Sequence, residues 1–270
     1  MKELNGRVAA ITGGGSGIGR ATAFVLGENG CALALADVNM DSLESVKREL
    51  KAKGIGPVTL HRCDVSNREE VERFASEVAE QHQRCDILVN NAGVTTAGRF
   101  EEEALADLEW LVGINLWGVI YGCRAFLPLL RQQPEAHIVN LSSMAGLLGL
   151  PRNAVYSMTK GAVRSFSEGL RAELRSSNIG VTMVHPGAID TAIVTAARGS
   201  DSARLQGMQS SLLRPLIMRK PSAVANAILR GINHDRARVV VGVDAHLVDL
   251  CTRVFPSRSG GIGRLIDRFS

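Results

Sequence analysis

The segment Thr12-Gly13-Gly14-Gly15-Ser16-Gly17-Ile18-Gly19 joins a short apolar run at residues 8–11 to a stretch at 20–27 with the hydrophobic spacing of a helix. This order of strand, glycine-rich turn and helix is typical of sites that bind the pyrophosphate of a dinucleotide. Glycine allows the backbone to turn sharply and to approach the phosphates without a Cβ in the way, while the free N–H groups that begin the helix attract the anion. A tight turn without a ligand would need similar glycines, so the turn alone does not distinguish the two.

An acidic residue stands where such a site needs one. Asp37 ends the second apolar run about 20 residues beyond the turn, at the position from which a carboxylate accepts hydrogen bonds from the adenosine ribose. A 2′-phosphate there would meet a like charge, and neither Ser16 nor Val38 supplies a compensating cation. Arg20 is the only base nearby. These residues predict NAD as the cofactor, with NADP less favoured.

The rest of the chain alternates short apolar runs with longer amphipathic stretches. The runs lie at 8–11, 32–36, 58–60, 87–89, 137–141, 181–184 and 239–243, and the amphipathic stretches at 40–53, 69–83, 116–131, 154–176 and 222–232. Seven strands separated by crossover helices predict a Rossmann-type α/β fold, a doubly wound parallel sheet with helices on both faces. For 270 residues we expect one domain, with an irregular substrate loop at 191–220 and an extension at 244–270.

The composition argues against several classes of protein. A hydrophobic content of 45% argues against disorder, and a net charge of +4 gives no dense basic face for nucleic acid. The five cysteines form no CxxC pair, which argues against a disulfide framework and a zinc site and favours a reducing compartment. The N-terminal apolar run is too short for a signal peptide, and no window approaches the ~18 apolar residues of a membrane span. We therefore expect a cytoplasmic protein.

Further motifs follow in a fixed order along the chain. Thr12, Gly13, Gly17 and Gly19 fit the pattern TGxxxGxG, and they are followed by Asp64-Val65, Asn90-Asn91-Ala92-Gly93, Asn115, Ser143, Tyr156, Lys160, Pro186-Gly187 and Thr191. Over residues 4–245 the chain resembles the classical short-chain dehydrogenase/reductase family. The resemblance implies an oxidoreductase that interconverts a secondary alcohol and a ketone with NAD or NADP.

The resemblance also implies a role for each motif residue. Catalytic roles are implied for Asn115, Ser143, Tyr156 and Lys160. Cofactor contacts are implied for Gly13, Ser16, Gly17, Ile18, Gly19, Asp37, Asp64, Val65, Asn90, Asn91, Ala92, Gly93, Tyr156, Lys160, Pro186, Gly187, Ile189 and Thr191. The family's serine precedes its tyrosine by 13 positions, which selects Ser143 rather than Ser142 as the group that stabilises charge on the substrate oxygen.

The asparagine role is also implied only by resemblance. In the family, this side chain and a local distortion of its helix hold a water in a proton relay that reaches the lysine. Asn115 has apolar neighbours on both sides, so its amide needs buried partners, and a purely structural asparagine is the alternative.

The residues themselves support the pairing of Tyr156 with Lys160. Positions four apart lie one turn above the other on the same face of a helix, so the phenol and the ammonium project toward one site. A nearby cation favours phenolate, so we expect Lys160 to lower the pKa of Tyr156 toward the range useful for acid–base catalysis. The alternative is a tyrosine that packs in the core and a lysine on the solvated face.

Other residues leave alternatives open. His185 has no second metal ligand at useful spacing, which favours a structural histidine. Apolar residues flank the expected pocket, namely Leu147, Leu148, Leu150, Ile193, Val194, Met208, Leu212 and Leu213. They predict a hydrophobic secondary alcohol or ketone as substrate, unless they pack against the insertion itself.

The extension at 244–270 is basic and partly amphipathic, and it has three interpretations. It packs against another subunit, covers the substrate pocket, or makes a membrane-surface contact, of which the last is the least favoured. The family resemblance implies a homodimer or homotetramer built on the helices at 116–131 and 154–176. Two other functions remain open: a binding protein without catalysis, and lyase or dehalogenase chemistry on the same fold.

Overall fold

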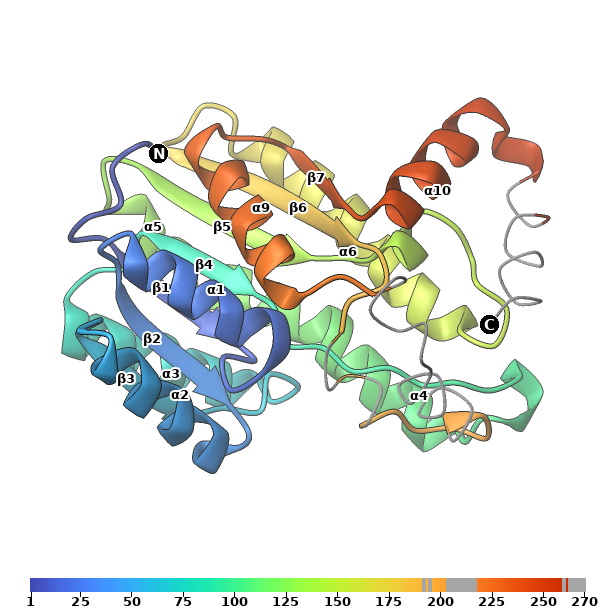
Figure 1. Cartoon of the computed structure of the whole chain (residues 1–270), viewed down its shortest axis with the longest axis horizontal. Coiled ribbons are helices and arrows are strands. Elements are labelled where there is room, and N and C mark those ends of the chain that lie inside the picture. Colours follow the sequence, from blue (N-terminus) through green and yellow to red (C-terminus); the bar gives the residue numbers. More distant parts are fainter. Residues whose placement is uncertain (191–192, 194–195, 203–217, 259–260, 262–270) are drawn as a thin grey trace.

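Seven parallel strands form one sheet in the order β3-β2-β1-β4-β5-β6-β7 in the computed structural model of the chain (Figure 1). The structure describes residues 1–190, 193, 196–202, 218–258 and 261. This sheet confirms the doubly wound α/β fold expected from the alternation of apolar runs. The strand order reverses direction between β1 and β4, and in open sheets of this kind ligands bind at the carboxyl edge where the order reverses.

The strands are short and mostly buried. Their bounds are β1 Val8–Thr12, β2 Ala32–Asp37, β3 Val58–Arg62, β4 Ile87–Asn90, β5 Ala136–Leu141, β6 Ile179–Pro186 and β7 Arg238–Val241. The register pairs Thr12 at the end of β1 with Ala36 of β2, and Asn90 at the end of β4 with Asn140 of β5. The motif residues that follow these strands therefore meet at one edge of the sheet.

Helices cover both faces. The α-helices are α1 Gly17–Glu28, α2 Met40–Ala52, α3 Arg68–His82, α4 Leu105–Val112, α5 Gly118–Arg131, α6 Ala154–Glu173, α9 Pro221–Asn233 and α10 Val243–Val254. Shorter turns are η1 Phe100–Glu102, the π-helical η2 Gly113–Trp117, η3 Met144–Gly146 and η4 Pro256–Arg258. Asn39 and Asn67 begin α2 and α3 by accepting hydrogen bonds from main-chain N–H groups of the first turn.

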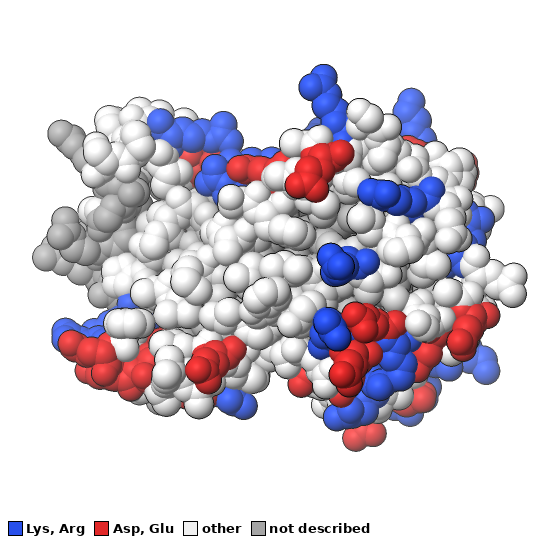
Figure 2. Space-filling view, turned by 180° about the vertical axis from the view of Figure 1, so that it is seen from behind, with Lys and Arg blue, Asp and Glu red and all other residues white. Residues whose placement is uncertain are grey.

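The two faces of the sheet contribute to two apolar cores because side chains of a strand alternate. Leu33 and Leu35 of β2 pack with α1, α2 and α9, where Leu26, Leu50 and Ile228 lie. Ala34 and Ala36 face the opposite core, where residues of α3, α5 and α6 such as Phe74, Phe126 and Val163 are buried. Figure 2 views this second side from behind and shows a largely uncharged band across its middle.

The structure adds three features that the apolar pattern did not predict. The expected helix at 116–131 begins earlier, as α4, and continues through η2 into α5. By length and composition this stretch, Leu105–Arg131, could cross a membrane; here α5 packs against α3, β4 and β5 as a helix of the fold. The run expected to reach residue 243 ends at Val241, and α10 follows directly.

The irregular segment after β6 is held to the body of the protein by main-chain pairing. Arg219 exchanges hydrogen bonds with Ala188 and Asp190, at 3.0 and 2.9 Å. Arg198 pairs with the loop after β4. The carbonyl oxygen of Arg198 accepts a hydrogen bond from Ala97 N in that loop at 2.9 Å. Residues 203–217, where Met208, Leu212 and Leu213 were expected to line a pocket, lie outside the described residues, as does Val194.

Candidate active site

The glycine-rich turn leaves the start of α1 open. Gly13 and Gly17 have positive φ values of 65° and 51°, which side chains rarely adopt. A Cβ on Gly19 would lie 2.1 Å from the carbonyl oxygen of Gly13, so this position must be glycine for the helix to approach the turn. Ser16 is the N-cap, but its side chain makes no capping hydrogen bond. Because no side chain caps them, the first N–H groups of α1 can receive a phosphate.

Asp37 lies in the same cleft, beside the glycine-rich turn. Its Oδ2 accepts a hydrogen bond from Gly15 N at 3.0 Å and its Oδ1 accepts one from Asn39 N at 3.1 Å. These bonds fix the carboxylate beside the turn, and each oxygen has a second lone pair for a ribose hydroxyl. The Arg20 guanidinium forms an ion pair with Glu49 of α2 and lies 4.9 Å from the centre of the Phe24 ring. Its charge is thus already paired.

One cleft contains most of the predicted cofactor residues. Its lining includes Gly13, Ser16, Gly17, Ile18, Asp37, Asp64, Val65, Asn91, Ala92 and Gly93. It also includes residues that the sequence did not single out as cofactor contacts: Val38, Cys63, Val94, Ile114, Ile193 and Ala196. The cleft follows the carboxyl ends of β1, β2 and β4, and its glycine turn, open helix start and carboxylate fit a dinucleotide. No sequence motif indicates that Ile114 and Ile193 contribute apolar side chains to this cleft.

Asn90 does not join this lining. Its side chain is buried and donates from Nδ2 to Asn140 Oδ1 at 2.8 Å, while its Oδ1 has no hydrogen-bond partner among the described residues. A Cβ on Gly122 would lie 2.2 Å from that oxygen, so α5 approaches β4 closely here. The Asn90 side chain points away from the cleft, because a strand turns successive side chains to opposite sides and Asn91 takes the cleft side. A contact between Asn90 and the cofactor stays a prediction.

Tyr156 and Lys160 lie on α6 with their functional groups together. The ammonium nitrogen of Lys160 is 5.9 Å from the centre of the Tyr156 ring and donates to the carbonyl oxygen of Leu141 at 3.1 Å. Lys160 is buried, and this burial lowers its pKa to about 8. A Cβ on Gly93 would lie 3.3 Å from Lys160 Nζ, so the lysine reaches the edge of the dinucleotide cleft.

The expectation that Lys160 lowers the pKa of Tyr156 is wrong. Burial raises the pKa of Tyr156, and only a hydrogen bond with Ser143 acts in the opposite direction. The ammonium is directed to a main-chain carbonyl, which explains why its charge does not offset the desolvation of the phenol. Tyr156 thus holds its proton at neutral pH.

The two adjacent serines have different surroundings. Ser143 makes the hydrogen bond with Tyr156, and as the N-cap of η3 its Oγ accepts a hydrogen bond from Ala145 N at 3.1 Å. Ser142 is buried and donates to the carbonyl oxygen of Lys160 at 2.8 Å. Ser143 therefore faces the phenol, while Ser142 ties the end of β5 to α6.

Asn115 lies in the π-helical turn η2 and is fully buried. Its Oδ1 accepts from Val94 N and its Nδ2 donates to Val94 O, both at 2.9 Å. A Cβ on Gly93 would lie 3.3 Å from Asn115 Oδ1, as it would from Lys160 Nζ. The distorted helix and the approach to Lys160 agree with the expected arrangement, and the bonds to Val94 satisfy the amide as a structural asparagine requires.

The turn after β6 is fixed by the start of α10. Ala188 N donates to Asp244 Oδ2 at 2.6 Å, and a Cβ on Gly187 would lie 2.2 Å from an oxygen of the same carboxylate. Gly187 N donates to Val241 O at 2.8 Å, and Ile189 is buried. Thr191, expected to contact the carboxamide, lies outside the described residues. The sequence did not single out Asp244, which no motif marks.

His185, at the end of β6, has a structural contact. Its Nδ1 donates to the carbonyl oxygen of Ser143 at 3.1 Å, and burial lowers its pKa to about 4. No group of three or more potential metal ligands occurs among the residues that the structure describes. A neutral histidine that fixes the main chain of Ser143 fits these observations.

Apolar residues adjoin the catalytic side chains. Leu147 and Leu148 are buried against Val248 of α10, and Leu150 packs partly against them. The described start of the C-terminal extension, α10, thus packs on this side of the site. The leucines that were expected to line the pocket contact this helix.

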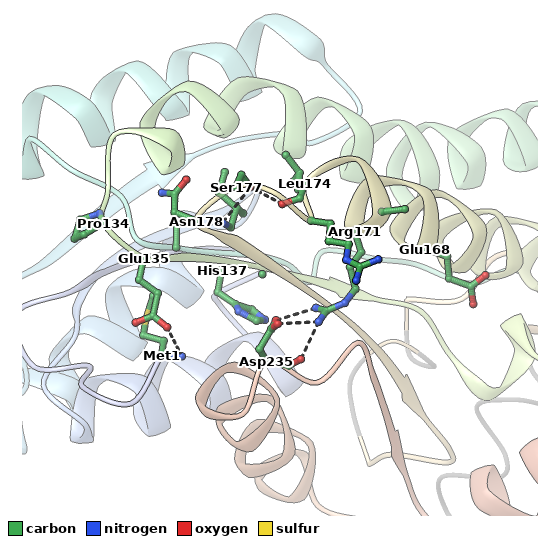
Figure 3. A pocket seen from close by; sticks show the side chains of 15 residues that line it. Met1, Pro134, Glu135, His137, Glu168, Arg171, Leu174, Ser177, Asn178 and Asp235 are labelled. Carbon is green, nitrogen blue, oxygen red and sulfur yellow. Dashed lines mark hydrogen bonds and ion pairs between the residues drawn. The ribbon is translucent and has the colours of Figure 1, made fainter.

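A second pocket lies at the opposite end of β5 and β6 (Figure 3). Arg171 spans it with two hydrogen bonds to the carboxylate of Asp235, both 2.8 Å. His137 Nε2 lies 2.7 Å from Thr182 Oγ1, whose proton goes to the carbonyl oxygen of Arg236, so the imidazole donates. None of the residues that line this pocket lines the dinucleotide cleft.

Comparisons with known proteins agree with this geometry. A family model described as short chain dehydrogenase matches residues 7–201. SadH of Mycobacterium tuberculosis, named as a candidate oxidoreductase, is 38% identical over 259 residues, which are 95% of this chain and 94% of SadH.

Solved structures with the same fold hold both types of nicotinamide dinucleotide. A short-chain dehydrogenase/reductase of Burkholderia phymatum in complex with NAD is 32% identical, with a TM-score of 0.85 over 96% of this chain and 95% of that one. An alcohol dehydrogenase of Thermococcus sibiricus, complexed with 5-hydroxy-NADP, is 29% identical, with a TM-score of 0.74 over 87% and 94%.

Proposed function

The chain belongs to the short-chain dehydrogenase family of oxidoreductases, and from that premise we propose that it interconverts a hydrophobic secondary alcohol and its ketone, with NAD as the favoured cofactor. The observation that carries the proposal is the meeting of Tyr156, Ser143 and Lys160 beside the dinucleotide cleft. The glycine turn and Asp37 would hold the dinucleotide, which when bound accepts a hydride from the alcohol carbon or donates one to the ketone carbon.

Each catalytic residue has a separate task in this proposal. In alcohol oxidation the Tyr156 phenolate takes the proton of the substrate hydroxyl group. The hydrogen on the carbon that bears this hydroxyl leaves with its electron pair as a hydride. Ser143 donates a hydrogen bond to the substrate oxygen and stabilises its charge. In ketone reduction the phenol returns its proton to that oxygen. Lys160 places its ammonium beside the Tyr156 ring, and Asn115 belongs to a relay that carries protons to this lysine.

The preference for NAD is supported by charge. Asp37 would repel a 2′-phosphate, Val38 beside it carries no charge, and Arg20 is paired with Glu49. The hydrophobic substrate is supported by Ile114 and Ile193 in the lining of the cleft, and by Leu150, which is only partly buried against Leu147 and Leu148. All five cysteines are free, in keeping with a reducing cytoplasm as the site of action.

We also propose that the chain forms a homodimer or homotetramer through α5 and α6. Two large apolar side chains at this face are exposed, Trp117 by 47% and Met158 by 52%. The face lies on the side of the molecule whose middle carries few charges (Figure 2). Burial of such a face stabilises an oligomer. Sedimentation equilibrium measures the subunit number, and a monomer at micromolar concentration would contradict this assembly.

The catalytic proposal is tested by one comparison. Purified wild type and Tyr156→Phe are assayed by absorbance at the reduced-nicotinamide band with a panel of aliphatic and cyclic secondary alcohols and ketones, each with NAD(H) and NADP(H). We expect turnover of apolar substrates, faster with NAD, and a loss of at least about 10²-fold in kcat for the variant because proton transfer in the transition state is removed.

The pH dependence of the same assay supplies an internal control. Because burial raises the pKa of Tyr156, oxidation should accelerate as pH rises, while reduction, which uses the protonated phenol, should not. Equal rates for wild type and variant would remove Tyr156 from the mechanism. Dinucleotide binding without turnover of any substrate would indicate the binding protein, and substrate loss without absorbance change would indicate lyase or dehalogenase chemistry.

A further inference from the structure

The start of α10 lies against the turn that follows β6. Strands β6 and β7 end side by side, with Pro186 paired to Val241, and α10 begins directly after β7 (Figure 1). Asp244, in the first turn of α10, accepts a hydrogen bond from Ala188 N at 2.6 Å. Hydrogen bonds to a carboxylate are shorter and stronger than those between neutral groups. One carboxylate thus connects the last described α-helix with this turn.

Two glycines make room for this carboxylate. A Cβ on Gly187 would lie 2.2 Å from both of its oxygens, and a Cβ on Gly242 would lie 2.3 Å from Asp244 Oδ1. Gly242 also has a φ of 113°, which side chains rarely adopt. An acid in the first turn of a helix is ordinarily a solvated group that interacts with the helix dipole. Here the turn encloses it, so the contact is specific to this place in the fold.

The helix that carries the carboxylate is itself fixed. Val248, one turn further on, packs against Leu147 and Leu148 in the loop that follows the catalytic serine. Asp249 accepts a hydrogen bond from the Arg238 guanidinium of β7. The first turn of α10 therefore holds Ala188 from a support that is packed on the rest of the protein.

The hydrogen bonds of the turn leave the main-chain groups of one residue for a ligand. The carbonyl oxygen of Ala188 accepts from Arg219 N at 3.0 Å, and Asp190 N donates to the carbonyl oxygen of Arg219 at 2.9 Å. Ile189, between them, pairs with Arg219 in a parallel bridge, so its own N–H and carbonyl oxygen point away from that residue. Neither group makes a hydrogen bond to a residue that the structure describes. A carboxamide, which has both an acceptor and donors, complements this pair of groups.

The part of the cleft that fits the adenosine end of a dinucleotide is remote from Asp244. The glycine-rich turn follows β1 and Asp37 ends β2, whereas β6 lies three strands away from β1 in the sheet. Neighbouring strands are about 4.8 Å apart, so three steps correspond to roughly 14 Å. A dinucleotide that lies along this edge with its pyrophosphate at the glycine-rich turn would meet the turn after β6 only with its nicotinamide end.

We propose that Asp244 is a positioning residue for the nicotinamide end of the cofactor. Its carboxylate holds Ala188, and this keeps the N–H and carbonyl oxygen of Ile189 directed to the carboxamide, without a contact between Asp244 and the cofactor. This inference rests on the proposed function, since it takes a nicotinamide dinucleotide as the ligand. Loss of the carboxylate should loosen the nicotinamide end and leave the adenosine end bound as before.

The test is isothermal titration calorimetry of the full chain with NADH and with ADP-ribose. Both ligands contain the adenosine, the pyrophosphate and the second ribose, but only NADH has a nicotinamide, which is uncharged in its reduced form. Wild type is compared with Asp244→Ala, Asp244→Asn and the control Asp249→Ala. Asp249 is a matched control because it is an acid of the same helix that binds Arg238 and Arg253 instead of the turn after β6.

We expect wild type to bind NADH more tightly than ADP-ribose. In Asp244→Ala the Kd of NADH should rise about tenfold, while the Kd of ADP-ribose should change by less than about twofold. Asp244→Asn keeps an oxygen that can accept from Ala188 N, so its loss should be smaller. Asp249→Ala should keep the wild-type ratio of the two Kd values even if its melting temperature falls.

Unchanged binding of ADP-ribose also shows that a variant is folded. If Asp244→Ala does not fold, the same selective loss is required of Asp244→Asn, whose uncharged acceptor makes a weaker bond. Equal losses for both ligands, no loss for either, or the same selective loss in Asp249→Ala would overturn the positioning role. A wild-type protein that binds neither ligand would instead overturn the proposed function, and this inference with it. None of these readouts uses enzyme activity.

Discussion

Ser142 and Ser143 are chemically identical neighbours that the fold uses differently. Ser143→Ala should lower kcat by about 10²-fold or more with little change in melting temperature, because its hydroxyl faces Tyr156. Ser142→Ala should cost about 1 kcal/mol of stability, because it removes the buried bond to the Lys160 carbonyl oxygen. Thermal melts and steady-state rates of both variants measure the contrast. The reverse pattern would exchange the two roles.

The cofactor preference also belongs to individual residues. In Asp37→Ser/Val38→Arg the repelling carboxylate is lost and a guanidinium is placed at the edge of the cleft. We expect kcat/KM with NADP to rise and that with NAD to fall, so that their ratio changes by about 10²-fold or more. Asp37→Ser alone is the control and should weaken NAD without a comparable gain for NADP. An unchanged ratio would place the selection elsewhere.

Site residues could be predicted from the sequence where a motif specifies both the residue type and its distance along the chain from another motif residue. Ser143 follows from its distance to Tyr156 along the chain, and the structure places it against the phenol. The direction in which Asn90 points could not be found in this way, because adjacent residues at a strand end diverge. Nor could the pKa of Tyr156, since it depends on how deeply the phenol is buried and on where the lysine hydrogen bond goes.

At the scale of elements, the π-helical turn η2 is the feature most closely connected with the site. Asn115 both accepts from and donates to the main chain of Val94, so a carboxylate could satisfy only one of the two bonds. Asn115→Asp should therefore destabilise the protein by about 1–3 kcal/mol. Chemical denaturation followed by circular dichroism measures this loss.

The same variant separates structural from catalytic effects. At a temperature where the Asn115→Asp protein remains folded, a rate loss of at least tenfold would support the proton relay. Full activity would leave Asn115 as a brace between η2 and the loop after β4. Leu108, a buried residue of the preceding helix α4, offers a control, because Leu108→Ala should lower stability without an equal effect on the rate.

Elements with a regular apolar period were predictable, and those defined by tertiary contacts were not. The seven strands and the helices that cross between them follow from alternation alone. The π-helical turn has no sequence period of its own, because its extra residue is stabilised by the contact of Asn115 with Val94. The start of α10 directly after β7 was also missed, since the apolar run continues across Gly242 into Val243.

For the whole molecule, two buried histidines make stability depend on pH. Burial lowers the pKa of His137 and of His185 from 6.5 to about 4. Between these pH values the unfolded chain binds protons that the folded protein does not, so stability falls as the pH falls from 6.5 to 4. Each histidine contributes a slope of about 1.4 kcal/mol per pH unit inside this window.

Replacing one of the two should reduce that slope. In His137→Gln, the new amide can still donate to Thr182 Oγ1, but it has no proton to bind in this range. We expect the free energy of unfolding to decline less steeply between pH 6.5 and 4 than in wild type, as measured by urea unfolding at several pH values. His234→Gln is the control, since that histidine bonds the Arg230 carbonyl oxygen at an exposed helix end. Parallel curves for all three proteins would mean that His137 titrates normally.

The fold of the whole chain could be predicted from the sequence more fully than the site residues or the individual elements. Length, a single pattern of alternation and ordered motifs indicated one sheet and the edge at which the cofactor binds. What these could not indicate was which surfaces remain exposed after folding, because that depends on how many faces of each helix find a partner. The sequence places Leu247 and Leu250 in the extension at 244–270 but does not indicate which way they face. The structure shows that they are exposed, because Val248 packs the other face of α10 against the protein.

Asp244 connects the last helix, α10, with the turn that follows β6. It begins the last helix, and its carboxylate receives the N–H of Ala188 in the turn where the nicotinamide is expected. Truncating the chain ahead of this residue would leave that amide without its acceptor, even though the seven-stranded sheet would be complete. The shortest catalytically competent fragment must therefore extend past the end of the sheet, and any shortened expression version should retain at least the first turn of α10.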